Sequence, residues 1–413
     1  MTLPAPTGGP SPTAPRARAH PLAPLGWAFY LASSWTWCIG MFLPVLLLRD
    51  YGIWGYLAFA APNVVGAAAM GWVLRSRAQA DRLATTHAGA ISAFYVVTIS
   101  FHAFWLAWLV TWVQGSIALP HNAIIAIVVG AVVLIFALGA ETRRSPARVA
   151  AALVWAVGAS LLIATFARPS ALAPPTTLYL DSTNPGVLWL APVCLFGFAL
   201  CPYLDATFLR ARASTTPAGS RLAFTLGFAV LFASMILLTL RYAGLFASIW
   251  DQDPSTAPLN APWLGLWLVA HLVAQLVFTV EVHYERLSVS PSRRAQVIVL
   301  PAVVASALLG FFWQHLPMVA GLFSAEVIYR VFMSFYGLLF PAYVWLCMIP
   351  TRDGHTGIAG PAGTRKLAVL AAAVILAAPC YWVGFIMRDE VWLGVGLGIV
   401  LVSRLLVRGH RAD

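Results

Sequence analysis

Two apolar stretches decide the fold: Trp35-Thr-Trp-Cys-Ile-Gly40-Met-Phe-Leu-Pro44 and Leu195-Phe-Gly197-Phe-Ala-Leu-Cys-Pro202-Tyr-Leu-Asp205. In each, a glycine is followed four or five residues later by a proline, and the stretches are offset by 157 residues at the glycine and 158 at the proline. Glycine leaves helical geometry at little cost, and proline removes a backbone donor and clashes with the preceding turn. We therefore expect two membrane helices, interrupted near Gly40–Pro44 and Gly197–Pro202, with the two breaks facing each other.

The composition excludes an ordinary soluble protein. Hydrophobic residues make up 61% of the 413 residues, charged residues make up 9%, and the mean hydropathy is +0.83. This apolar surface must face lipid, and a helix needs roughly 20 mostly apolar residues to cross a bilayer. We predict an all-α polytopic membrane protein of about twelve transmembrane helices. The predicted spans are residues 25–48, 52–74, 88–113, 120–140, 148–167, 186–209, 221–245, 262–281, 295–314, 319–349, 366–387 and 390–408.

Basic residues lie on one side of the predicted spans. Counted alternately from the N-terminal tail, one side receives 20 of the 25 Lys and Arg residues, and the other receives Arg49, Arg168, Arg241 and Arg388. The positive-inside rule places both termini in the cytoplasm and favours an even number of spans. We expect an integral protein of the bacterial inner (plasma) membrane. The net charge of +11 follows from these loops, so no nucleic-acid partner is expected.

The shared break predicts an internal repeat. An odd number of spans separates the first and sixth helices, so they run in opposite directions, as in transporters built from inverted repeats. The predicted organisation is a disordered cytoplasmic tail (1–24), two five-helix repeats (25–168 and 185–350), and two additional helices with a C-terminal tail (351–413). Two similar kinks arising by chance are the alternative, because membrane helices contain many Gly and Pro residues.

Four short segments resemble the sodium/solute symporters: residues 35–44, Tyr51-Gly-Ile-Trp-Gly55, Ala61-Pro-Asn63-Val-Val-Gly66 and Gly197-Phe-Ala-Leu-Cys-Pro-Tyr-Leu-Asp205-Ala-Thr-Phe. The resemblance implies the five-plus-five leucine-transporter fold over roughly residues 25–350. It also implies that the broken first and sixth helices hold a solute beside the third and eighth helices.

Two polar stripes lie in those further helices. Tyr95, Thr98 and His102 share one face of the third span, and His271, Gln275 and Thr279 recur every four residues in the eighth. Polar side chains in spans mark either substrate pathways or hydrogen bonds between helices. The predicted solute-binding residues are Trp37, Cys38, Gly40, Tyr95, Thr98, His102, Gly197, Cys201, His271 and Gln275. Asn63 is expected to satisfy a backbone group freed by Pro62.

Ion coupling and gating are assigned to four further residues. Asp205 and Thr279 are the candidate coupling residues, although Asp205 could instead pair with Arg210 or Arg212. The eighth helix lacks the adjacent hydroxyl pair typical of sodium-coupled relatives, so sodium coupling, proton coupling through His271 or Asp205, and uncoupled exchange all stay open. Glu326 and Arg330, spaced i, i+4, are either a charged gate or a self-neutralising structural pair.

The sequence thus favours a secondary transporter of a small solute that works by alternating access and is not an enzyme. It has no phosphate-binding loop and no metal-ligand spacing, so the expected partners are solute and lipid, with sodium or a proton as coupling ion. The second hypothesis is a membrane haem or redox protein with His102 and His271 as axial ligands. A third is a membrane enzyme using Glu281, His283 and Glu285. A channel is least favoured.

Overall fold

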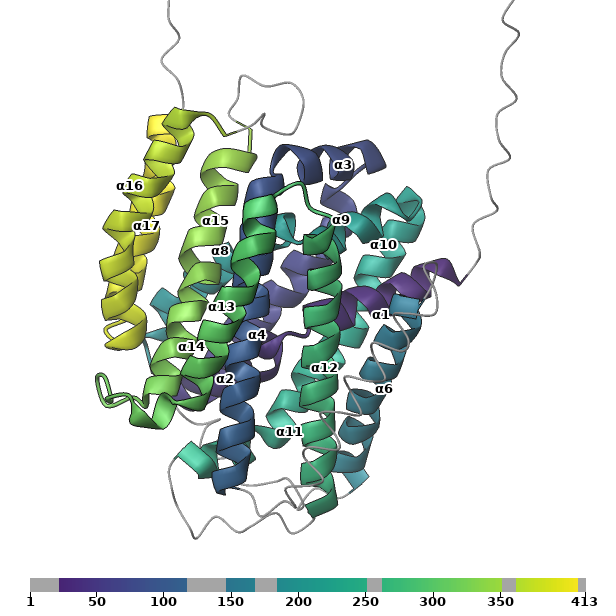
Figure 1. Ribbon diagram of the computed structural model, residues 1–413, viewed down its shortest axis with the longest axis vertical. Helices are drawn as coiled ribbons and strands as arrows, with labels where there is room; N and C mark the ends of the chain where they lie inside the picture. Colours follow the sequence, from purple (N-terminus) through teal and green to yellow (C-terminus); the bar gives the residue numbers. More distant parts are fainter. Residues whose placement is uncertain (1–21, 117–145, 168–183, 251–261, 351–361, 408–413) are drawn as a thin grey trace, which may run out of the picture.

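The computed structural model describes residues 22–116, 146–167, 184–250, 262–350 and 362–407. These residues form a bundle of helices, and the isolated bridge Val319–Leu322 is the one β-type pairing among them (Figure 1). The longer helices are α1 (Ala23–Trp35), α2 (Cys38–Val73), α3 (Arg77–Thr86), α4 (Ala88–Ser116), α6 (Pro146–Ala167), α8 (Val187–Leu200), α9 (Ala206–Ala213), α10 (Pro217–Thr225), α11 (Ala233–Trp250), α12 (Pro262–Ser288), α13 (Arg293–Phe311), α14 (Ser324–Ser334), α16 (Thr364–Tyr381) and α17 (Val391–Val407).

The all-α membrane class is confirmed. Among the described residues, nine helical segments are long and apolar enough to cross a bilayer, and α17 is a shorter apolar helix. The outer surface fits lipid as well. On α13 the exposed side chains Val297, Leu300, Val304 and Leu308 recur every three or four residues and form a continuous apolar stripe. Soluble proteins rarely expose such a stripe to water, so lipid is the expected neighbour. The predicted span at 120–140 and the tail through residue 21 lie outside the described residues.

Helix α2 joins two predicted spans at a single residue. Gly52 has φ 64° and ψ −156°, a conformation open essentially to glycine, and it divides α2 into residues 38–51 and 53–73. The first part completes the first predicted span, and the second part is the predicted span 52–74. The predicted boundary therefore coincides with the corner. Between this helix and α4, the short exposed helix α3 was not predicted.

The first break lies earlier than predicted. Helix α1 ends at Trp35, Thr36 and Trp37 are non-helical, and α2 begins at Cys38, so Gly40 and Pro44 are inside a helix. Side chains rather than glycine stabilise the interruption, because the Thr36 hydroxyl donates to the Ala32 carbonyl at 2.8 Å and the Trp37 indole donates to the Ser34 carbonyl. Gly40 has room for a side chain: an added Cβ would meet Phe232 at 3.4 Å, an ordinary contact.

The second break lies where the sequence indicates it. Helix α8 ends at Leu200, a 3₁₀ turn follows at Cys201–Leu204, Asp205 is extended, and α9 begins at Ala206. Gly197 has a packing role here, because a Cβ on it would lie 2.7 Å from the carbonyl oxygen of Tyr336. That carbonyl belongs to a π-helical turn, Phe335–Leu339, which follows α14.

Close backbone approach also fixes α8 against α2, one of the most extensive helix pairs in the molecule. A Cβ on Gly66 of α2 would lie 2.7 Å from the carbonyl oxygen of Phe198 in α8. At the other end of the chain, α16 and α17 pack on each other as a hairpin at the edge of the bundle (yellow in Figure 1).

We expect Gly66→Ala to lower the midpoint of thermal unfolding, measured on purified protein in detergent. The added methyl group would push α2 and α8 apart, and overpacking of this kind costs about 1–3 kcal/mol. The matched control is Gly398→Ala in α17, where nothing lies within 4 Å of the new Cβ. Equal losses in the two variants would contradict close packing at Gly66.

Candidate functional site

The backbone groups freed by the first break are bonded to neighbouring side chains. In the last turn of α1, the Leu31 carbonyl accepts from Ser34 Oγ, and the Ala32 carbonyl accepts from both the backbone N–H and the hydroxyl of Thr36. The Ser33 carbonyl accepts from Gln275 Nε2, and the Ser34 carbonyl accepts from Trp37 Nε1. Gln275 belongs to α12, so the eighth predicted span does reach the break. It bonds the backbone there, with its other amide atom, Oε1, buried and without a partner among the described residues.

His102 caps the start of α2. Its Nε2 accepts from the Cys38 N–H at 3.4 Å, and its Nδ1 lies 2.7 Å from the Thr98 carbonyl. A carbonyl can only accept, so Nδ1 carries a hydrogen and the ring is the neutral tautomer. Both nitrogens are therefore bonded within the protein. Thr98 in turn shares a hydrogen bond of 2.9 Å with the Tyr336 hydroxyl.

A small enclosed cavity separates the two breaks. It is lined by Trp35, Trp37, Ile39, Gly40, Asn63, Phe198, Cys201 and Tyr336. Its free volume is about 10 Å³, which is about the space that one water molecule needs. Asn63 accepts from the Trp35 indole at 2.7 Å. The breaks thus face a common space, and indole, phenol, amide and thiol groups line it without a charged side chain.

The structure brings together part of the predicted solute-binding set. Trp37, Gly40 and Cys201 line the cavity, whereas Cys38, Thr98 and His102 lie directly behind it, linked by the hydrogen bonds above. His271 lies elsewhere: its ring is against Gly158 of α6, where an added Cβ would meet it at 2.7 Å. Tyr336 lines the cavity but was not predicted, because an isolated aromatic residue gives no signal in a chain with 13% aromatics.

Asp205 and His283 form a buried pair at the second break. Asp205 Oδ1 accepts from the Thr207 N–H at 2.7 Å and so caps α9, while Oδ2 lies 3.6 Å from His283 Nε2. Both side chains are fully buried. The alternative pairing of Asp205 with arginine is wrong, because Arg210 bonds Glu285 at 2.9 Å and Arg212 bonds backbone carbonyls of Leu74, Arg75 and Thr215.

The other predicted coupling residue, Thr279, has its hydroxyl hydrogen engaged within its own helix. The Thr279 hydroxyl donates to the Gln275 carbonyl of its own helix at 3.0 Å. Tyr95 lies beside the buried pair instead of at the cavity, with its ring centroid 4.9 Å from that of His283. The sequence indicated His283 only as a member of a candidate catalytic cluster with Glu281 and Glu285. The members of that cluster have different partners, because His283 faces Asp205, whereas Glu285 bonds Arg210 and Arg286.

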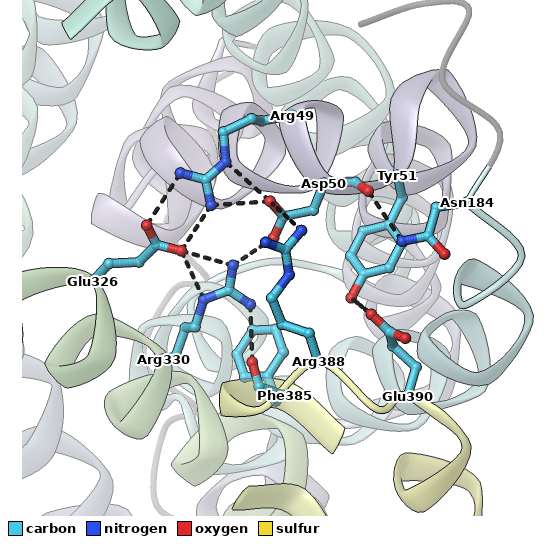
Figure 2. Close-up of polar contacts among 9 residues, drawn as sticks. All are labelled: Arg49, Asp50, Tyr51, Asn184, Glu326, Arg330, Phe385, Arg388 and Glu390. Carbon is cyan, nitrogen blue, oxygen red and sulfur yellow. Dashed lines mark hydrogen bonds and ion pairs between the residues drawn. The ribbon is translucent and has the colours of Figure 1, made fainter. Parts of the chain in front are cut away.

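Five charged side chains form a network (Figure 2), and the start of α14, which contributes two of them, lies at the opposite end of the bundle from α3 and α9 (Figure 1). Arg49 and Asp50 come from α2, Glu326 and Arg330 from α14, and Arg388 from the connection between α16 and α17. The Glu326–Arg330 pair forms as predicted, at 2.8 Å, but it is one part of a larger set. Arg330 also bonds Asp50 and the Phe385 carbonyl, and Arg49 bonds Glu326 at 2.7 Å.

The network is buried and unevenly charged. The side chains of Asp50, Glu326 and Arg330 are at most 2% exposed, whereas Arg388 is 40% exposed and lies 3.4 Å from Asp50. Three cations face two anions, so the set as a whole is not self-neutralising. Beside it, the Tyr51 hydroxyl bonds Glu390 at 2.7 Å and ties the same corner of α2 to the start of α17 (Figure 2).

Of the two histidines named for the haem alternative, His102 has both nitrogens bonded within the protein, and the His271 ring lies against α6. Within the described ranges, no three His, Cys, Asp or Glu side chains gather as a metal-ligand set.

Fold and site together define the chain as a polytopic α-helical membrane protein with two interrupted helices at its centre. No known protein family, curated protein or solved structure matches it.

Arg330→Met is expected to lower the free energy of unfolding by about 3–5 kcal/mol, because it leaves Asp50 and Glu326 buried with less compensating charge. Arg388→Met is the control, since an exposed pair contributes about 0–1 kcal/mol. Denaturation of both purified variants measures the difference. Similar costs for the two substitutions would show that burial of the network does not set its energetics.

Proposed function

We propose that this protein is a secondary transporter that moves a small solute by alternating access around the two broken helices. One observation carries the proposal: the interruptions at Thr36–Trp37 and Cys201–Asp205 border one enclosed cavity. A membrane protein tolerates non-helical backbone only where protein or a polar cavity satisfies it. Such breaks are the usual location of a transported solute, because half-helix ends present partial charges there.

The packing pattern supports a five-plus-five inverted repeat. Suppose that each span of the first repeat corresponds to the span five places later. The contact between α1 and α6 then corresponds to a contact between α8 and the π-helical turn after α14, and both contacts are present. Likewise, the contact between α2 and α8 corresponds to contacts of α10 and α11 with the first span, which consists of α1 and the start of α2. These contacts are also present. Independent helices that happened to share a Gly/Pro motif would have no reason to exchange neighbours in this way. The same pattern is consistent with the leucine-transporter fold implied by the symporter-like motifs.

The charged network is suited to a gate. It joins α2, α14 and the α16–α17 connection mainly through ion pairs between side chains, and these can break and re-form without refolding of the backbone. The asymmetry of the loop charges supports an outward-facing location for this end. With the network closed and the cavity only as large as a water molecule, the conformation corresponds to a closed intermediate of the cycle.

The cavity lining narrows the class of solute. Aromatic faces of Trp35, Trp37 and Tyr336 surround it, with hydrogen-bonding capacity from Asn63. Because no charged side chain lines it, a small polar solute without net charge fits best, bound by stacking and by the ends of the half-helices.

Uptake into proteoliposomes tests this function. With a panel of sugars, zwitterions and planar polar compounds, and with imposed sodium or pH gradients, we expect saturable uptake of at least one solute. Trp37→Ala should abolish it, because Trp37 forms part of both the break and the cavity wall. Trp54→Ala is the control, since Trp54 is 60% exposed on the outer surface of α2. Absence of uptake for the whole panel under every gradient would contradict the proposal.

Cysteine labelling tests the gate. In a variant with Cys201 as its single cysteine, a membrane-impermeant thiol reagent should react slowly, and Glu326→Gln should accelerate the reaction by weakening the network. A variant that retains only Cys347, a fully buried thiol in the π-helical turn Val344–Met348, should not be accelerated, because it lines neither the cavity nor the network. Equal acceleration of both thiols would indicate general loosening in place of gate opening.

A further inference from the structure

We propose that Asp205 and His283 bind one proton between them, and that this proton is the coupling ion of the transporter. The coupling role rests on the proposed function, whereas the proton site itself does not. The pair lies where the second break meets α12, and its two facing atoms, Oδ2 of Asp205 and Nε2 of His283, are buried without a hydrogen-bond partner among the described residues.

The backbone fixes the tautomer of His283. Its Nδ1 lies 2.7 Å from the Thr279 carbonyl, which can only accept, so Nδ1 carries a hydrogen. In the neutral ring Nε2 is therefore a bare acceptor, and it is directed at a carboxylate oxygen, another acceptor, 3.6 Å away. Two facing acceptors repel each other. A single proton on either atom converts the contact into a hydrogen bond or an ion pair.

Asp205 cannot relieve the conflict by turning away. Its Oδ1 accepts from the Thr207 N–H as the cap of α9, which directs Oδ2 toward α12. Without a proton, the pair carries one negative charge in a fully buried place. With a proton, it is neutral overall, either as carboxylic acid and imidazole or as carboxylate and imidazolium. Burial strongly favours the state without net charge.

No neighbouring group replaces the proton. The titratable groups that face the pair from the surrounding elements are Tyr95, His102 and Tyr336. Tyr30, Arg210 and Arg286 lie around Tyr95 and beside one another. The two arginines both bond Glu285, at 2.9 and 2.7 Å, and neither donates to Asp205. His102 is fixed in its neutral form by the Thr98 carbonyl and the Cys38 N–H, and the tyrosines are neutral in ordinary conditions.

The pair adjoins the cavity, so its proton and the solute can influence each other. The Trp37 ring, which lines the cavity, contacts the His283 ring edge-on with centroids 5.3 Å apart. Asp205 itself caps the N-terminus of α9, the second half of the broken helix. Movement of either half-helix during opening would change the Asp205–His283 contact directly.

The same geometry disfavours sodium. A sodium ion would have to compete for the carbonyls of Leu31, Ala32, Ser33 and Ser34 at the end of α1, each of which already accepts from a protein donor. The Thr279 hydroxyl is also bonded to its own helix. The Gln275 amide thus occupies the Ser33 carbonyl at the end of α1.

Infrared difference spectroscopy of the purified full-length protein, between acidic and alkaline buffer, tests the proton site without any solute. We expect bands of a protonated carboxyl or an imidazolium group that disappear in both Asp205→Asn and His283→Asn. Asparagine retains the cap on α9 at the first position and can donate to the Thr279 carbonyl at the second. The exposed residue Asp81 provides the control, Asp81→Asn, which should keep these bands. Unchanged spectra in both pair variants would overturn the proton site.

Transport in proteoliposomes then tests the coupling role. For a solute found in the panel, wild-type protein should accumulate it with an imposed pH gradient, and each pair variant should lose accumulation while retaining solute exchange across the membrane. Accumulation that depends on sodium and persists in both variants would overturn proton coupling and leave the transporter proposal intact. If no solute moves but the infrared bands depend on Asp205, the transporter proposal and its coupling role are wrong and the proton site stands.

Discussion

A helix interrupted inside a membrane frees backbone donors and acceptors that lipid cannot satisfy, and the centre of this molecule is organised around that constraint. The freed carbonyls of α1 are bonded by Ser34, Thr36, Trp37 and Gln275, and the freed N–H of Cys38 is bonded by His102. At the second break, Asp205 meets the start of α9. The polar residues of the third, sixth and eighth predicted spans are therefore placed by the demands of the backbone.

This explains how structural and functional interpretations of the same side chains can both hold. A group that satisfies a broken helix must lie beside the break, and it is then within reach of anything bound there. Thr98 shows the relation clearly, because it supports His102 through its carbonyl and Tyr336 through its hydroxyl, and Tyr336 lines the cavity. Such groups hold the wall of a site in position even where they do not touch its contents.

The sequence predicted the membrane class, most span positions and the second break, because these depend on apolar length and on local Gly/Pro chemistry. It misplaced the first break by several residues. Pro44 follows Gly40 by one helical turn, so its missing N–H affects a single carbonyl and α2 continues through it. It also failed to pair Asp205 with His283, which are 78 residues apart in the chain. Contacts of this kind depend on how helices are rotated, and periodicity leaves that undetermined.

The corner at Gly52 has a mechanical consequence. The part of α2 before it, residues 38–51, is about 20 Å long at 1.5 Å per residue. It joins the second part of α2 directly at Gly52, without a loop that could absorb movement. A change of about 10° in the dihedral angles at this one residue would displace the Cys38 end by about 3 Å, through simple leverage over that length. The charged residues Arg49 and Asp50 lie beside the pivot, where displacement is smallest and force is greatest. Small rearrangements among those charges would therefore be amplified along the helix into large ones at the cavity.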